Sequence, residues 1–163
     1  MRPYTYVSLF SSAGVGCYGF KEEKYDCVLT NELVERRMEV QKCNAKCSDP
    51  RGYLCGDITD PEVQKYALNH INEYKKNKNL KDIDVVIATP PCQGMSTAGQ
   101  KRNNDERNSL IIHILNLIQE TSPKFVFIEN VPNFLKTLIK YNEKDILIPD
   151  LIKNKLEKEN LIQ

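Results

Sequence analysis

Residues 84–96 read DVVIATPPCQGMS, an apolar stretch that runs directly into two prolines, a cysteine and a polar segment. Continuous apolar character over a few residues is typical of a parallel strand buried on both faces. The two prolines stiffen the backbone in front of Cys92. A thiol at the carboxyl end of such a strand is well placed for nucleophilic chemistry, although it could also be a small buried hydrophobic side chain. The surrounding sequence has to distinguish these two interpretations.

The rest of the chain alternates between expected strands and expected helices. Strands are expected over residues 5–10, 26–32, 53–58, 84–89 and 124–131. Helices are expected over 17–23, 33–44, 61–78, 109–122 and 149–160, and also after Pro132, where Phe134, Leu135, Leu138 and Ile139 are apolar. Because apolar strands alternate with helices, the pattern predicts an α/β fold whose mostly parallel sheet is covered by helices on both faces.

Ligands of such sheets bind outside the carboxyl ends of the strands. Four features fall there: the glycine-containing turn 11–16, Glu32, Asp57 and the loop of Cys92. An acid at the end of the second strand suits the two hydroxyls of a ribose. Together the features predict a nucleoside-containing cofactor, although each one alone also fits an ordinary turn or strand end.

Glu129 and Asn130 end the strand that is expected beside the strand of Cys92. We expect Glu129 to be partly desolvated, which favours its protonated form and would suit a proton donor near neutral pH. A thiol and a carboxylic acid at adjacent strand ends form a candidate catalytic pair. The polar segment 95–108 is long for an ordered connection, which favours a functional loop. We interpret His113 as structural.

Composition limits the choice of function only weakly. The 163 residues suffice for one domain, and the net charge of +1, from 23 basic and 22 acidic residues, neither indicates nor excludes nucleic acid. No apolar run is long enough for a membrane span and the first residues lack a signal peptide, so we expect a cytosolic protein. Cys43, Cys47 and Cys55 could suggest zinc, but no CxxC pair or nearby histidine completes a site; we expect free thiols and no metal.

Six segments together resemble the motifs of the cytosine-5 DNA methyltransferase family, in that family's order. They are LFSSAGVGCYGF (9–20), TNEL (30–33), GDI (56–58), PPCQGMS (90–96), DERNSL (105–110) and ENV (129–131). The combination of Pro-Cys-Gln with Glu-Asn-Val is the most specific part. The resemblance covers roughly residues 5–140 and implies the Rossmann-like fold of S-adenosylmethionine-dependent methyltransferases.

The resemblance also implies roles for individual residues. The Cys92 thiolate would attack C6 of a cytosine flipped out of double-stranded DNA, Glu129 would protonate or hydrogen-bond N3, and C5 would take the methyl group from S-adenosylmethionine. Pro91 and Asn130 would shape the cytosine pocket. The implied cofactor-binding residues are Phe10 (on adenine), Ser11, Ala13, Gly14, Glu32 (on ribose), Leu33, Asp57 (on the adenine amino group), Ile58, Pro90 and Leu110. The implied DNA-binding residues are Gln93, Ser96, Lys101, Arg102 and Arg107.

The chain departs from the family pattern in two places. Ser12 stands where the family usually has glycine, which would tighten the approach of the cofactor. The sequence ends at KENLIQ (158–163), and nothing in it resembles the later motifs or the target-recognition region. We therefore expect residues 1–163 to be the N-terminal part of a catalytic domain, truncated after about the fifth strand, that needs a complementary polypeptide. The fifth strand would then be an exposed apolar edge.

Other functions stay open from the sequence. An inactive cofactor-binding remnant or regulatory module fits the short chain, whereas the presence of Cys92 and Glu129 favours catalysis. An RNA cytosine-5 methyltransferase is less favoured, because that branch resembles Cys-Phe-Thr rather than the residues found after Pro91. A NAD-binding domain would leave Cys92 unexplained. The expected location is the bacterial cytoplasm, or the nucleus in a eukaryote, and restriction–modification is the common bacterial context of such enzymes.

Overall fold

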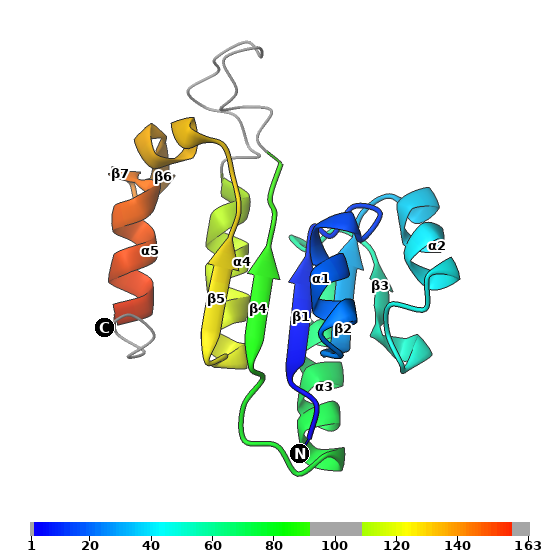
Figure 1. The fold of residues 1–163 in the computed structure, drawn as a ribbon. Helices are drawn as coiled ribbons and strands as arrows, with labels where there is room; N and C mark the ends of the chain where they lie inside the picture. The colour runs from blue at the N-terminus through cyan, green and yellow to red at the C-terminus, as the bar shows by residue number, and fades with distance from the viewer. Residues whose placement is uncertain (1, 92–108, 158–163) are drawn as a thin grey trace.

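A five-stranded parallel sheet forms the centre of the molecule, in the strand order β3-β2-β1-β4-β5 (Figure 1). The computed structural model describes residues 2–91 and 109–157. The strands are β1 (Thr5–Leu9), β2 (Asp26–Glu32), β3 (Tyr53–Cys55), β4 (Val85–Ala88) and β5 (Phe125–Ile128). The predicted α/β class is confirmed, and the strand order is that of a Rossmann-like sheet with its switch point between β1 and β4.

Helices follow the strands in turn and lie on both sides of the sheet. They are α1 (Tyr18–Glu22), α2 (Glu35–Cys43), α3 (Pro61–Asn77), α4 (Leu110–Thr121) and α5 (Ile148–Glu157), with 3₁₀ turns at Val15–Cys17, Pro50–Gly52 and Pro132–Lys136. In Figure 1, α1 lies in front of β1 and β2, whereas α3 and α4 lie behind the sheet. Asp60 caps α3 by accepting a hydrogen bond from the Glu62 amide at 2.8 Å.

The larger core lies between the sheet and the helices behind it. Residues of β1 and β4 such as Val7 and Val86 are fully buried there, together with Ile71 of α3 and Ile114 of α4. A smaller core on the side of α1 contains Tyr6, Cys17, Cys27, Cys47 and Val85. Side chains alternate along β1 between these two cores, so β1 is buried along its whole length.

A buried carboxylate joins the amino ends of three strands. Asp84, 2% exposed, accepts hydrogen bonds from Arg2 Nη1 at 2.9 Å, Lys124 Nζ at 2.7 Å and the Thr5 amide at 2.9 Å. Burial alone would raise the pKa of Asp84, but these hydrogen bonds outweigh it and hold the pKa well below its ordinary value. The opposite end of the sheet is therefore free to carry the site.

The prediction of a helix after Pro132 is wrong. Beyond the 3₁₀ turn the chain forms an antiparallel hairpin of β6 (Leu138–Tyr141) and β7 (Lys144–Leu147). Asn142 and Glu143, with φ of 51° and 62°, make the two-residue turn that suits such a hairpin. Ile139 and Ile146 pair across it, so alternation of apolar residues, not helical spacing, describes this segment.

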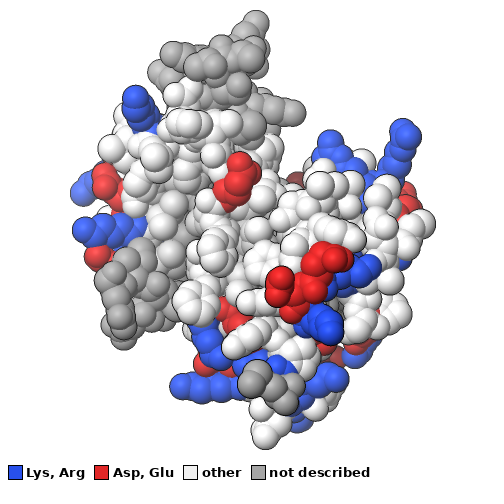
Figure 2. All heavy atoms as spheres, in the orientation of Figure 1, with Lys and Arg blue, Asp and Glu red and all other residues white. Residues whose placement is uncertain are grey.

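The fifth strand lies at the edge of the sheet, as expected, and one of its faces has no cover among the described residues. Phe125 and Phe127 are 63% and 54% exposed, whereas Val126 and Ile128 are half-buried on the side of α4. The prediction that helices cover both faces is therefore wrong for β5. Figure 2 shows few charged side chains over this front part of the sheet, while Lys and Arg gather near the lower and outer margins.

Candidate active site

A cavity of about 780 Å³ opens at the carboxyl ends of the strands. It lies where the loops after β1, β2, β3 and β4 meet, which is the place that the topology predicts for a ligand. Seven of the residues predicted from the sequence line it: Phe10, Glu32, Leu33, Asp57, Ile58, Pro91 and Leu110. A volume of this size fits an organic cofactor.

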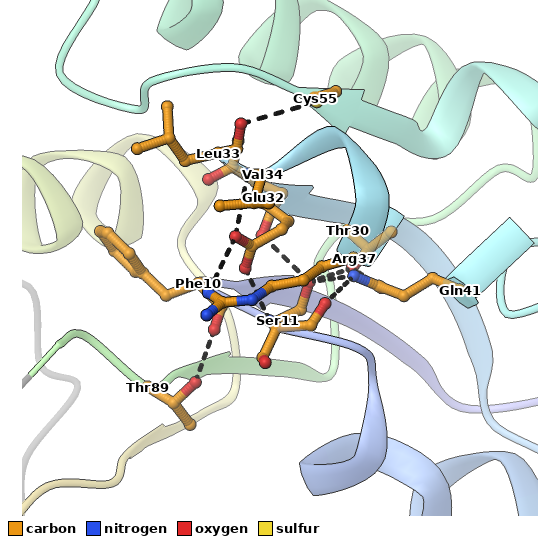
Figure 3. Close-up of polar contacts among 12 residues, drawn as sticks. Phe10, Ser11, Thr30, Glu32, Leu33, Val34, Arg37, Gln41, Cys55 and Thr89 are labelled. Carbon is orange, nitrogen blue, oxygen red and sulfur yellow. Dashed lines mark hydrogen bonds and ion pairs between the residues drawn. The ribbon is translucent and has the colours of Figure 1, made fainter. Parts of the chain in front are cut away.

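Glu32 ends β2 at the wall of this cavity and is 5% exposed. Its Oε2 accepts a hydrogen bond from the Ser12 amide at 2.8 Å. Its Oε1 accepts one from the Val34 amide at 3.0 Å (Figure 3). Arg37 of α2 places Nη1 3.5 Å from the same Oε1. A carboxylate offers about four acceptor sites. The side chain therefore holds the turn after β1 in place and keeps acceptor capacity for a ligand.

The turn after β1 has an unusual backbone. Phe10, Ser12 and Gly14 all lie in the left-handed region, with φ of 55°, 49° and 86°. Thr89, after β4, supports the first of them by donating from Oγ1 to the Phe10 carbonyl at 2.9 Å (Figure 3). A left-handed conformation costs an L-residue roughly 1–2 kcal/mol. This cost explains why glycine suits position 12, and Ser12 adopts the conformation nonetheless.

A buried glutamine holds this turn from below. Gln41 of α2 is fully buried and donates from Nε2 to Ser11 Oγ at 2.8 Å and to the Ser12 carbonyl at 2.6 Å. Its Oε1 accepts from Lys46 Nζ at 3.0 Å and lies 2.7 Å from Thr30 Oγ1. Sequence reasoning missed Gln41, because a glutamine in a charged helix carries no signal of burial.

Four residues predicted to bind the cofactor do not line the main cavity: Ser11, Ala13, Gly14 and the buried Pro90. Ser11 is buried and donates from Oγ to the Asn31 carbonyl at 3.0 Å, so it supports the turn. Ala13 and Gly14 line a second cavity of about 130 Å³ on the side of α1 and α2. The geometry therefore does not favour direct contact between these side chains and a ligand in the larger cavity.

The side-chain amide of Asn31 positions the segment that leads into Asp57. Its Nδ2 donates to the carbonyls of Leu54 at 3.1 Å and Gly56 at 3.0 Å. Asp57 Oδ1 accepts hydrogen bonds from the amide and the hydroxyl of Thr59, both at 2.9 Å. Its Oδ2 has no partner among the described residues, and the side chain is exposed at the cavity. Asp57 therefore both caps a turn and offers an acceptor.

The ends of β4 and β5 are joined by Asn130. Its Nδ2 donates to the carbonyl of the buried Pro90 at 3.0 Å, and its Oδ1 accepts from the Val131 amide at 2.9 Å. The Glu129 amide donates to the Ala88 carbonyl at 3.0 Å, but the Glu129 side chain is exposed. The expected desolvation of Glu129 is wrong for this structure, because β5 is an edge strand and no described residue covers its end.

The remaining predicted residues lie outside the described part of the chain. They are Cys92, Gln93, Ser96, Lys101, Arg102 and Arg107. The described chain reaches the cavity wall at Pro91, directly before Cys92.

Comparison with known proteins identifies the family. A profile of the C-5 cytosine-specific DNA methylases matches residues 4–155. The chain belongs to this family. The resemblance drawn from the six motifs is thereby confirmed.

Two similar proteins are bacterial Type II methyltransferases. The chain is 37% identical to the Type II methyltransferase M1.HgaI of Avibacterium volantium, covering 94% of this chain and 40% of that protein. It is 47% identical to the Type II methyltransferase M.AgeI of Thalassovita gelatinovora, covering 79% and 28%. The fold is similar to a solved prophage-encoded protein of E. coli described as a DNA modification methyltransferase, with a TM-score of 0.60, 25% identity and coverage of 95% and 38%. The chain therefore spans about 40% or less of these proteins.

Neither a metal site nor a membrane-spanning helix is found among the described residues of the chain. No three His, Cys, Asp or Glu side chains within residues 2–91 and 109–157 are grouped to hold a metal ion. Cys43, Cys47 and Cys55 are free thiols, of which Cys47 is buried beside Cys27. No helix in the same two ranges is long and apolar enough to cross a membrane.

The residues that line the cavity without having been predicted as site residues include Arg37, Thr89 and His113. Arg37 lies over Glu32, and Thr89 joins the loops after β1 and β4. His113 was interpreted as structural, yet it lines the cavity together with Leu110. The signal for His113 was present in the sequence, since residues three apart on a helix lie on one face.

Proposed function

We propose that residues 1–163 are the N-terminal part of a catalytic domain that methylates C5 of cytosine in double-stranded DNA, with S-adenosylmethionine as methyl donor. The observation that carries the proposal is one cavity that joins Phe10, Glu32, Asp57 and Leu110 to Pro91, the residue before Cys92. The Type II methyltransferase relatives favour DNA modification in a bacterium, within a restriction–modification system.

The cavity fits the cofactor chemically. Glu32 has acceptor capacity for the ribose hydroxyls, and Oδ2 of Asp57 can accept from the adenine amino group. Phe10, Leu33 and Ile58 supply apolar walls for the base. When bound there, S-adenosylmethionine supplies an activated methyl group.

Cys92 is the proposed nucleophile and Glu129 the proposed proton donor. The Cys92 thiolate adds to C6 of a flipped cytosine while Glu129 donates to N3, so that C5 becomes nucleophilic and accepts the methyl group. Loss of the C5 proton to water, return of the N3 proton to Glu129 and expulsion of the Cys92 thiolate would then release 5-methylcytosine, with S-adenosylhomocysteine as the other product. Because the Glu129 side chain is exposed, the flipped cytosine itself would have to exclude water from it.

Asn130 and Pro91 orient this chemistry. The hydrogen bond from Asn130 to the Pro90 carbonyl ties the loop of Cys92 to the end of β5, which keeps the thiol and Glu129 on neighbouring strand ends. Gln93, Ser96, Lys101, Arg102 and Arg107 are the proposed DNA contacts.

We propose a binding surface on this chain for the part of the enzyme that the 163 residues do not include. Phe125 and Phe127 form an apolar face on β5 that nothing among the described residues covers. Because the chain spans about 40% or less of its relatives, we assign this face to the complementary part of the enzyme, in the same or a second polypeptide. That part would also supply target recognition.

The first test is calorimetric titration of the 163-residue chain with S-adenosylmethionine. We expect binding, and a loss of at least about tenfold in Asp57→Asn, because the new amide keeps Oδ1 for Thr59 but presents a donor to the adenine amino group. Asp60→Asn is the matched control, since asparagine caps helices equally well and Asp60 is not at the cavity. A folded chain without affinity for the cofactor would contradict the proposal for this part.

Covalent trapping tests the chemistry. With the complementary part supplied, DNA containing 5-fluorocytosine should form a complex that survives denaturation, because fluorine cannot leave C5 as a proton does. Cys92→Ala should abolish it. Cofactor binding without trapping would instead support an inactive binding module, and trapping by RNA alone would support the RNA-modifying alternative.

A further inference from the structure

His113 of α4 lines the main cavity, one helical turn after Leu110. Its Nδ1 lies 3.0 Å from Nε2 of Gln64 on α3. The same Gln64 nitrogen lies 2.8 Å from the carbonyl oxygen of Ile58, which follows β3 and also lines the cavity. The histidine is thus held by a hydrogen-bonded chain that begins at the loop of Asp57.

This chain determines which ring nitrogen carries the proton. A carbonyl oxygen can only accept, so the Ile58 carbonyl identifies the nitrogen end of the Gln64 amide. The second hydrogen of that amide is then directed at His113 Nδ1, which must accept it. In a neutral imidazole whose Nδ1 accepts, the proton is on Nε2. His113 therefore presents an N–H donor.

The Nε2 donor of His113 has no acceptor among the described residues. The ring is only half-buried and lies at the cavity wall. The two acids proposed to hold the nucleoside, Glu32 and Asp57, act only as acceptors when ionised. A purine also presents acceptor nitrogens, which these acids cannot satisfy. A donor at this wall supplies the missing partner.

We infer that His113 is a cofactor-binding residue whose Nε2–H donates a hydrogen bond to a ring nitrogen of the adenine of S-adenosylmethionine. Gln64 is the positioning residue that keeps the proton on Nε2. The inference rests on the proposed function, because it concerns the same cavity and the same cofactor.

Calorimetry of the 163-residue chain with S-adenosylmethionine, S-adenosylhomocysteine and adenosine tests the contact. His113→Phe, which keeps the ring volume without a donor, should weaken all three about 3- to 10-fold, the size of one neutral hydrogen bond. His113→Gln, whose amide nitrogen reaches the position of Nε2, should recover most of the affinity. Equal weakening by both variants, or by neither, would overturn the assignment.

Nitrogen-15 spectra of the imidazoles give a readout that a purely structural role would not change. The chain has two histidines, and His70 is an internal reference because its Nε2 is 3.0 Å from the buried Val28 carbonyl. We expect His113 to be protonated on Nε2 and to shift when S-adenosylhomocysteine saturates the chain, while His70 stays unchanged. A proton on Nδ1, or an unshifted His113 at saturation, would overturn the inference.

The outcomes separate this inference from the proposed function. Binding by the unaltered chain that is weakened in Asp57→Asn but not in His113→Phe would overturn the role of His113 alone. Absence of cofactor binding by the folded, unaltered chain would overturn both.

Discussion

Ser12 shows how a single backbone angle decides what a position prefers. Its φ of 49° lies in the region where a Cβ is unfavourable, and its amide is needed by Glu32. The resemblance implied only that Ser12 stands where the family usually has glycine. The angle shows that a serine at this position lowers the stability of the fold relative to glycine. The hydrogen bond from the Ser12 amide to Glu32 at the cavity is nevertheless made.

We expect Ser12→Gly to raise the free energy of unfolding by about 1 kcal/mol, because glycine adopts a left-handed conformation without the steric penalty. Urea denaturation would measure the change. Ser12→Ala is the control and should give no gain, since alanine keeps the Cβ and no side-chain hydrogen bond of Ser12 is seen in the described structure. A gain of the same size in both variants would show that the backbone angle is not the cause.

At the scale of elements, α2 and the turn after β1 form one unit through a polar contact. Gln41 is fully buried and joins Ser11, Ser12, Thr30 and Lys46. Helices usually pack through apolar faces, but here the buried positions of α2 are Met38 and Gln41. Gln41 therefore positions the turn at the site through hydrogen bonds, a role that hydrophobic patterning in the sequence could not predict.

Gln41→Leu should lower the free energy of unfolding by about 2–3 kcal/mol, because several buried polar groups lose a partner at once. It should also weaken S-adenosylmethionine binding, since the turn that carries Phe10 would loosen. Thermal unfolding and calorimetry would measure the two effects. Glu39→Leu, an exposed position on the same helix, should change neither by much.

The hairpin of β6 and β7 is the element that sequence reasoning mistook. The segment has apolar residues at Leu138, Ile139 and Ile146, which fit either period over so short a run. Two consecutive left-handed residues, Asn142 and Glu143, decide in favour of a hairpin. A short apolar run next to a 3₁₀ turn gave no independent sign of that choice.

At the scale of the whole molecule, the sheet has a structural end and a functional end. Asp84 ties β1, β4 and β5 together at their amino ends, while the cavity lies at the carboxyl ends of β1, β2, β3 and β4. This division lets the loops of the site carry strained and polar residues, because the strands are anchored elsewhere.

Acid should weaken the fold through Asp84. The pKa of Asp84 is lowered in the folded chain, so its contribution is complete above the unfolded value of about 3.9 and is lost as the pH falls below it. Asp84→Asn should cost about 2–3 kcal/mol at pH 7 and flatten this loss. Urea denaturation at a series of pH values would test both. An unchanged pH dependence in the variant would contradict the assignment.

The exposed face of β5 should govern association. Replacing Phe125 and Phe127 together by serine should reduce self-association of the chain in sedimentation and leave its stability nearly unchanged, because both side chains are largely exposed. The same variant should impair assembly with a complementary part. Replacing Tyr66, exposed on α3, by serine is the control.

The sequence by itself determined the family, the parallel α/β class and the set of residues at the strand ends. It could do so because buried parallel strands require apolar runs and because motif residues follow them in a set order. Only the tertiary structure showed that Gln41 supports the turn, that Ser11, Ala13 and Gly14 lie away from the main cavity, and that Glu129 is exposed. It alone brought His113 to the cavity wall and Gln64 within hydrogen-bond distance of it. These properties depend on which elements become neighbours, and contacts between α2, α3, α4 and the loops are not encoded in local spacing.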